Sequence, residues 1–295
     1  MTNRGMSEGA GFAQSELEQR YEEYRKILKK LTIMSDIFMR NVLKEKECTE
    51  YLLRIIMQKK DLHVVEQTIQ KDYKNLQGRS GILDCVARDG QDKQYDIEIQ
   101  QENEGASPKR ARYHSSLMDC NTLKPGQNFD ELPENYVIFI TRKDVLRKGL
   151  PICHIERKIR ETKDDFQDGS HMIYVNSQNE EDSELGRLMH DLNCMDADEM
   201  YSEVLAKRVK ELKETEEGVE RMCTEMEEIY GKGELRGIAI GEARGITIGE
   251  LNAKRKTARS LFEMKLPVEQ IARAVSADVA TVQEWLTAEK VGDYL

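Results

Sequence analysis

Apolar and polar residues alternate along two runs of the chain, residues 82–88 and 94–100. Between them lies a short polar loop that contains Asp89 and Gly90, and two alternating runs joined by such a loop predict a β-hairpin. Side chains alternate across a strand, so one face of the second run is apolar. The opposite face carries three polar side chains, Asp96, Glu98 and Gln100.

The register of this hairpin brings two carboxylates together. If residues 89–93 form the loop, Arg88 faces Gln94, and the same register places Asp84 opposite Glu98. Facing residues have Cβ atoms about 4.5–5.5 Å apart, so the two acids repel each other unless a cation lies between them. Mg²⁺ suits such a place because it prefers oxygen ligands. The alternative is an ordinary hairpin with a polar, solvent-facing side.

The remaining pattern predicts helices interleaved with strands. Residues 136–141 are apolar on both faces, which is typical of a buried central strand, and residues 172–176 form a second such strand. Shorter strands are expected at 62–65 and 150–156. Helical spacing of apolar residues, with capping residues at Ser35 or Asp36 and at Ser107-Pro108, predicts helices on either side of the hairpin. The fold class is therefore α/β.

The C-terminal part of the chain has a different, entirely helical pattern. Residues 196–232 form an acidic amphipathic helix with a heptad-like apolar seam from Leu205 to Tyr230, packed within the chain or between chains. The C-terminal residues 253–295 form three short helices, and the last two resemble a helix-turn-helix. The final helix has no Arg or Lys before Lys290, so a packing module fits equally well. The predicted organisation is a disordered tail, a sheet domain, a long helix, a glycine repeat and a small helical module, at residues 1–15, 16–195, 196–232, 233–252 and 253–295.

Glycine recurs at every fourth position from Gly233 to Gly249. Each glycine costs a helix about 1 kcal/mol relative to alanine, so a helix here needs a compensating contact such as close approach of a second helix. Charged residues in the repeat argue against a lipid environment. The repeat therefore predicts a homo-oligomer through residues 196–252, or else a linker that orders poorly.

Composition limits the classes of function. The formal net charge of −10 argues against a protein that coats nucleic acid, although a local basic patch remains compatible with a nuclease. No apolar run is long enough to cross a membrane and no secretory signal is present, so we expect a cytoplasmic protein without membrane contact. Six scattered cysteines without a C-x-x-C pair suggest neither a zinc site nor a disulfide framework.

The spacing of Asp84, Glu98 and Gln100 resembles the active-site pattern of the PD-(D/E)XK nucleases, with Gln in place of the usual Lys. The Gln form is similar to the PD-(D/E)XK nuclease family transposases, also called recombination-promoting nucleases. This resemblance implies a restriction-endonuclease-like mixed sheet flanked by helices, and a metal-dependent DNA endonuclease linked to recombination or mobile elements. It also implies that Asp84 and Glu98 bind Mg²⁺ or another divalent cation, and that all three side chains are catalytic.

Further site residues follow from the resemblance and from local charge. Family members carry an Arg–Tyr pair on the helix after the acidic strand, which Arg112 and Tyr113 match here, and Arg79 lies in the turn that enters the hairpin. These three residues are candidates for binding DNA phosphates, with an ordinary charged turn and an amphipathic helix as the alternatives. In such nucleases a first helix often donates an extra acid to the metal, and the candidates here are Asp36, Glu45 and Glu50.

Two functions from different classes are consistent with these patterns. The first is a Mg²⁺-dependent DNA endonuclease, in which Gln100 orients water or phosphate but cannot act as a base or a cation. The second is a catalytically inactive DNA-binding or oligomeric scaffold that keeps the fold, which the acidic net charge and Gln100 favour. Convergence of the three side chains supports the first, and a basic group already paired with the acids supports the second.

Overall fold

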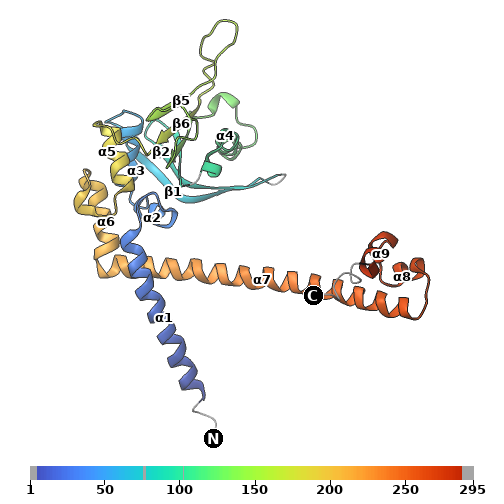
Figure 1. Ribbon diagram of the computed structural model, residues 1–295. Coiled ribbons are helices and arrows are strands. Elements are labelled where there is room, and N and C mark those ends of the chain that lie inside the picture. Colours follow the sequence, from blue (N-terminus) through green and yellow to red (C-terminus); the bar gives the residue numbers. More distant parts are fainter. Residues whose placement is uncertain (1–4, 76–77, 102, 288–295) are drawn as a thin grey trace. The chain divides into compact units, whose positions relative to one another are not determined.

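The computed structural model describes residues 5–75, 78–101 and 103–287. The chain divides into two compact units, residues 1–226 and 227–295 (Figure 1). Residues 1–4 of the predicted tail and residues 288–295 of the predicted C-terminal module lie outside the described residues. Helix α1 begins at Gly5, within the stretch that the sequence assigned to a disordered tail.

A six-stranded mixed sheet forms the centre of the first unit, in the order β1-β2-β3-β4-β6-β5. Strands β3, β4 and β6 are parallel, while β1 and β5 close the two edges with antiparallel pairing. The sheet and the helices around it confirm the predicted α/β fold class. The strand bounds are β1 Val64–Tyr73, β2 Gly81–Asp89, β3 Gln94–Gln100, β4 Asn135–Thr141, β5 Ile152–Ile155 and β6 Ser170–Asn176.

The hairpin β2–β3 has the register that the sequence predicts. Arg88 pairs with Gln94 and Cys85 with Ile97, so Asp84 and Glu98 are next to each other at the open end of the hairpin. The carboxylate of Asp89 accepts hydrogen bonds from the backbone N–H groups of Gln91 and Lys93, each at 2.9 Å, which stabilises the tight loop.

The first strand differs from its prediction. The sequence indicated a short strand at residues 62–65, whereas β1 has 10 residues and pairs along most of β2. Most of its side chains are exposed or half-buried, so apolar alternation is weak in this segment and the pairing with β2 determines its length.

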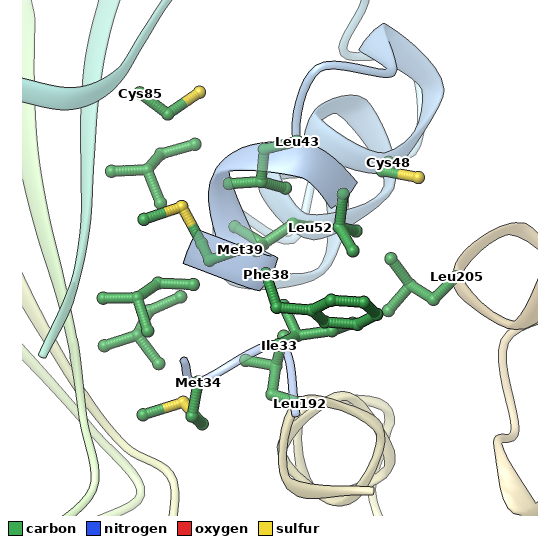
Figure 2. Close-up of a cluster of buried hydrophobic side chains, with 14 of the residues drawn as sticks. Ile33, Met34, Phe38, Met39, Leu43, Cys48, Leu52, Cys85, Leu192 and Leu205 are labelled. Carbon is green, nitrogen blue, oxygen red and sulfur yellow. The ribbon is translucent and has the colours of Figure 1, made fainter. Parts of the chain in front are cut away.

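Strand β4 is buried along its whole length because helices cover both faces of the sheet. Ile138 and Ile140 point into the larger core. Three helices contribute to this core, α2 (Asp36–Val42), α3 (Lys46–Ile56) and α5 (Glu184–Asn193), and Figure 1 shows where they lie. Val137 and Phe139 point into the second core, beneath α4 (Pro108–Thr122). Figure 2 shows the larger core, where side chains from α2 and α3 meet Leu192 and Leu205.

The predicted heptad seam is divided between two helices, α6 and the start of α7, and both help to complete the larger core. Leu205, Val209 and Leu212 belong to α6, and Cys223 and Met226 to the start of α7, and all five are buried in this core. The seam is therefore packed within the chain up to Met226. The helix is interrupted at Thr215, whose hydroxyl accepts a hydrogen bond from the N–H of Gly218 at 3.0 Å. The remaining helical bounds are α1 Gly5–Lys30, α6 Glu203–Glu214, α7 Glu216–Glu263 and the 3₁₀ turns Asn103–Ala106, Phe129–Glu131 and Ala197–Glu199.

The second unit contains the rest of α7 together with α8 (Val268–Ala274) and α9 (Val279–Thr287). Its small core is built around Ala258, Ile271 and Val282. Within α7, apart from adjacent residues and the helix's own backbone, no described atom comes within 4 Å of where a Cβ would stand on any glycine from Gly233 to Gly249. Within the second unit, the described residues thus leave this glycine stripe uncovered. None of the described helices combines the length and apolarity that a bilayer span requires.

Truncating a core leucine tests the role of the larger core. Leu52 is fully buried, so Leu52→Ala is expected to lower the free energy of unfolding by about 2–5 kcal/mol. Leu150 is 52% exposed, and Leu150→Ala is expected to change the free energy of unfolding by less than about 0.5 kcal/mol. Urea denaturation followed by circular dichroism measures both, and equal effects of the two substitutions would contradict the assignment of this core.

Candidate active site

Strands β2 and β3 bring the side chains of Asp84, Glu98 and Gln100 together at one end of the hairpin. The amide nitrogen Nε2 of Gln100 lies 3.5 Å from Oδ2 of Asp84 and 3.4 Å from Oε2 of Glu98. Oε1 of Glu98 accepts a hydrogen bond of 2.9 Å from the backbone N–H of Asp84. Glu98 is fully buried, while Asp84 and Gln100 are partly exposed. The three side chains therefore converge.

A third carboxylate, that of Asp96, lies on the same face of β3 and is also fully buried. Its Oδ2 is 2.8 Å from Nδ1 of His114. Its Oδ1 is buried without a hydrogen-bond partner among the described residues. Buried polar atoms are rarely left unpaired, so this oxygen is available for a proton or a cation.

Helix α4 supplies the only two basic side chains that touch these carboxylates within the described residues. Its start is fixed as the sequence predicts, since Ser107 caps it by accepting from the N–H of Arg110 and Pro108 occupies the first turn. Arg110 and His114 then lie one turn apart on the face that points to the sheet. Nη2 of Arg110 donates to Oε2 of Glu98 at 2.9 Å, and its Nε donates to Nε2 of His114 at 3.1 Å.

Burial and mutual repulsion favour the neutral forms of these acids. Burial, followed by the charges of Asp96 and Asp84, raises the pKa of Glu98 to about 9. Burial and the charge of Asp36 raise the pKa of Asp84 to about 6. Burial also raises the pKa of Asp96 well above its ordinary value and lowers the pKa of His114. When all three acids are ionised, three negative charges face the single positive charge of Arg110, which leaves −2.

The site has the donor atoms that a divalent cation requires. Asp96, Glu98 and His114 each offer one ligand atom, and these atoms lie within 4.8 Å of one another. Asp84 is not part of this group of three; its Oδ2 lies beside it, 3.5 Å from Nε2 of Gln100. A divalent ion would balance the charge of −2 and would give the unpaired Oδ1 of Asp96 a partner. The carboxylate oxygens therefore fit a hard divalent ion such as Mg²⁺, whereas both ring nitrogens of His114 are already engaged by Asp96 and Arg110.

The three candidates for an extra acid are placed differently. Asp36 forms an ion pair of 2.7 Å with Arg40, and its charge acts on Asp84 from the start of α2. Glu50 instead accepts from the N–H of Val64 at 3.0 Å and pairs with Arg54. Glu45 lies 3.7 Å from Arg208. Only Asp36 of these three thus influences the carboxylate cluster.

The predicted phosphate-binding residues lie outside the carboxylate cluster. Arg79 and Arg112 are exposed, and Arg112 points away from the sheet while Arg110, two residues earlier, points into the cluster. The hydroxyl of Tyr113 donates to the backbone carbonyl of Arg79 and accepts from the side chain of Asn75 at 3.3 Å. Tyr113 therefore ties the turn between β1 and β2 to α4 and brings Arg79 near that helix.

Sequence reasoning missed Arg110, His114 and Asp96 as members of the site. Asp96 could have been included, because it shares a strand face with Glu98. Arg110 and His114 carry a weaker signal, a basic pair at helical spacing shortly after the cap at Ser107, which does not reveal the face that meets the sheet.

One of the comparisons with known proteins supports this fold. No curated protein and no solved structure matches the chain significantly. The family model described as PD-(D/E)XK nuclease family transposase matches residues 17–232, nearly three quarters of the chain and all the residues of the candidate site. The chain belongs to the PD-(D/E)XK nuclease family transposases.

Proposed function

We propose that this protein is a metal-dependent DNA endonuclease that hydrolyses phosphodiester bonds. The observation that carries the proposal is the convergence of Asp84, Glu98 and Gln100, next to Asp96 and Arg110, in a cluster whose fully ionised form has a charge of −2. Family membership supports a nuclease role. Recombination or the movement of mobile elements is the biological setting that we infer from it.

Each side chain has a separate task in this proposal. Asp84 and Glu98 hold the metal, with Mg²⁺ as the favoured ion. When bound, the metal would supply an activated water and stabilise negative charge on the phosphate. Gln100 donates its amide N–H groups to a water or phosphate oxygen; it is neutral and cannot take up a proton at neutral pH. Burial of Glu98 keeps bulk water away from one side of the site.

Exposed basic residues beside the site provide contacts to DNA. Arg79 and Arg112 are candidates for binding backbone phosphates, because guanidinium groups match phosphate geometry. Tyr113 holds the turn of Arg79 against α4, which carries Arg112, and this contact supports a shared role of the two guanidinium groups. The remaining acidic charge of the protein opposes nonspecific binding elsewhere.

A catalytically inactive DNA-binding or oligomeric scaffold is the second candidate. The ion pair between Arg110 and Glu98 favours it, because a guanidinium already neutralises one candidate metal ligand. The two candidates differ in whether a divalent metal binds and whether DNA is cut.

Isosteric substitutions of the two acids test the endonuclease. Glu98→Gln and Asp84→Asn keep side-chain volume but remove a metal ligand, so plasmid nicking in Mg²⁺ is expected to fall by at least about 100-fold. Glu180→Gln, at an exposed glutamate, serves as the matched control and should leave nicking unchanged. Nicking by both site variants at the rate of the unsubstituted protein would exclude this role for the two acids.

The pH dependence of thermal stability tests metal binding without DNA. The unfolded chain loses the proton of Glu98 near 4.5 and the folded protein near 9, so stability without metal should decrease as pH rises through this window. Mg²⁺ competes with these protons and should raise Tm more at about pH 8.5 than at about pH 5.5. Differential scanning calorimetry measures both trends, and Glu98→Gln should weaken them. If Mg²⁺ leaves Tm unchanged at every pH, the result would favour the scaffold.

We also infer that the protein self-associates through residues 227–252 of α7. The predicted seam runs from Leu205 to Tyr230, and its part up to Met226 is already used inside the first unit, which leaves the glycine stripe as the main uncovered part of the predicted interface. Exposed Ile238, Ile240, Ile246 and Ile248 flank this stripe. Close approach of a second copy would offset the cost of the glycines.

The six cysteines, all unpaired within the described residues, are consistent with the cytoplasmic location that we propose.

A bulky residue on the stripe tests self-association. Gly241→Leu should lower the molar mass in solution from an oligomer to a monomer, because the added side chain separates the helices. Ala243→Leu introduces the same side chain on the opposite side of the helix and should keep the oligomer. Sedimentation equilibrium distinguishes the two. An unsubstituted protein that is monomeric at all concentrations would refute the inference.

A further inference from the structure

We propose that Arg110 supplies to the active site the positive charge that residue 100 lacks, and that Asp96 and His114 hold it in position. The proposal rests on the endonuclease function proposed above. In the PD-(D/E)XK pattern residue 100 is usually Lys, and in this chain it is the neutral Gln100. A guanidinium is ionised at every accessible pH, so Arg110 is a permanent cation.

Arg110 and Gln100 contact the same atom. Nη2 of Arg110 lies 2.9 Å from Oε2 of Glu98, and Nε2 of Gln100 lies 3.4 Å from that same oxygen. A lysine at position 100 would bring its ammonium group to the region that the guanidinium now occupies. In this chain the cation beside the glutamate therefore lies on the facing helix α4 rather than on the strand, and its distance to Glu98 is that of a direct ion pair.

Three acceptors fix the plane of the guanidinium. In addition to Glu98, Nη1 donates to the backbone carbonyl of Gly105 at 2.9 Å and Nε donates to Nε2 of His114 at 3.1 Å. Its Cζ also lies 5.9 Å from the ring centroid of Phe139. The Arg110 side chain is nevertheless 36% exposed, whereas that of Glu98 is fully buried. The guanidinium therefore borders both the carboxylates and the solvent from which a DNA phosphate would approach.

Asp96 and His114 determine the orientation of the Arg110 guanidinium through a chain of hydrogen bonds. Nε2 of His114 accepts from Arg110, so the ring proton of the neutral imidazole is on Nδ1, which donates to Oδ2 of Asp96 at 2.8 Å. A protonated imidazole would present a second N–H to Arg110 and would lose this bond. His114 and Asp96 are positioning residues for Arg110, which itself contacts the substrate phosphate and stabilises its developing negative charge.

A charge-relocation experiment tests the proposal in the full-length protein. Arg110→Gln removes the cation and should reduce plasmid nicking in Mg²⁺ by at least about 100-fold. Without DNA, the same substitution should tighten Mg²⁺ binding by roughly tenfold in isothermal titration calorimetry, because a positive charge beside a metal ligand is lost. Arg110→Lys keeps the charge and should leave the Mg²⁺ affinity near that of the unsubstituted protein.

Rescue of nicking by a lysine at position 100 distinguishes a role of the Arg110 charge from a purely structural role of Arg110. The double variant Arg110→Gln/Gln100→Lys should nick plasmid at least about tenfold faster than Arg110→Gln alone. Its Mg²⁺ affinity should return to that of the unsubstituted protein. His114→Leu should also impair nicking, and Gln100→Lys should rescue it, because a lysine on the strand does not depend on His114 for its position. Circular dichroism and Tm verify that each variant is folded.

The outcomes separate this proposal from the proposed function. If the unsubstituted protein neither binds Mg²⁺ nor nicks DNA, the endonuclease and the role of Arg110 are both overturned. If it binds and nicks, but Arg110→Gln changes neither measurement, only the role of Arg110 is overturned. Failure of Gln100→Lys to rescue either folded variant would likewise overturn it, and an unfolded Arg110→Gln would leave His114→Leu and its rescue as the deciding measurement.

Discussion

The confinement of three carboxylates with a single guanidinium sets the chemistry of this protein. Asp84, Asp96 and Glu98 lie on one face of the β2–β3 hairpin, and two of them are fully buried. Removing charges from water is costly unless they are paired, so the cluster must retain protons or bind a cation. The sheet tolerates this arrangement because β2 and β3 are held by β1 and β4 on either side and by packed helices on both faces.

The convergence at the hairpin was predictable because strand geometry is local and strict. A short loop fixes the register, a period of two fixes the faces, and together they place Asp84, Glu98 and Gln100 at one end. The cap at Ser107-Pro108 and the buried strand β4 were predictable for similar reasons, since each depends on a few adjacent residues. The prediction of the fold class followed from the same elements.

The partner of the acids was harder to predict because it depends on how a helix is rotated against the sheet. Arg110 and Arg112 are two residues apart, which places them on different sides of α4, and the sequence does not reveal which side packs. Docking of Leu117 and Met118 in the second core decides this and turns Arg110 inward. The length of β1 and the fate of Glu50, which binds Arg54 and Val64, likewise depend on contacts between distant segments.

Among the described residues, the side chains joined by hydrogen bonds or ion pairs within the carboxylate cluster all come from residues 84–114, while Phe139 packs against Arg110 and Asp36 acts on Asp84 through its charge. The excursion between β5 and β6 and the segments after β6 contribute packing but no ligand atom to the cluster among the described residues. Helices α5, α6 and the start of α7 are held by the larger core, but insertions or deletions in the loop between β5 and β6 can accumulate without disturbing the arrangement of acids and base. Evolutionary change in length is expected to concentrate there, while residues 84–114 vary little in spacing.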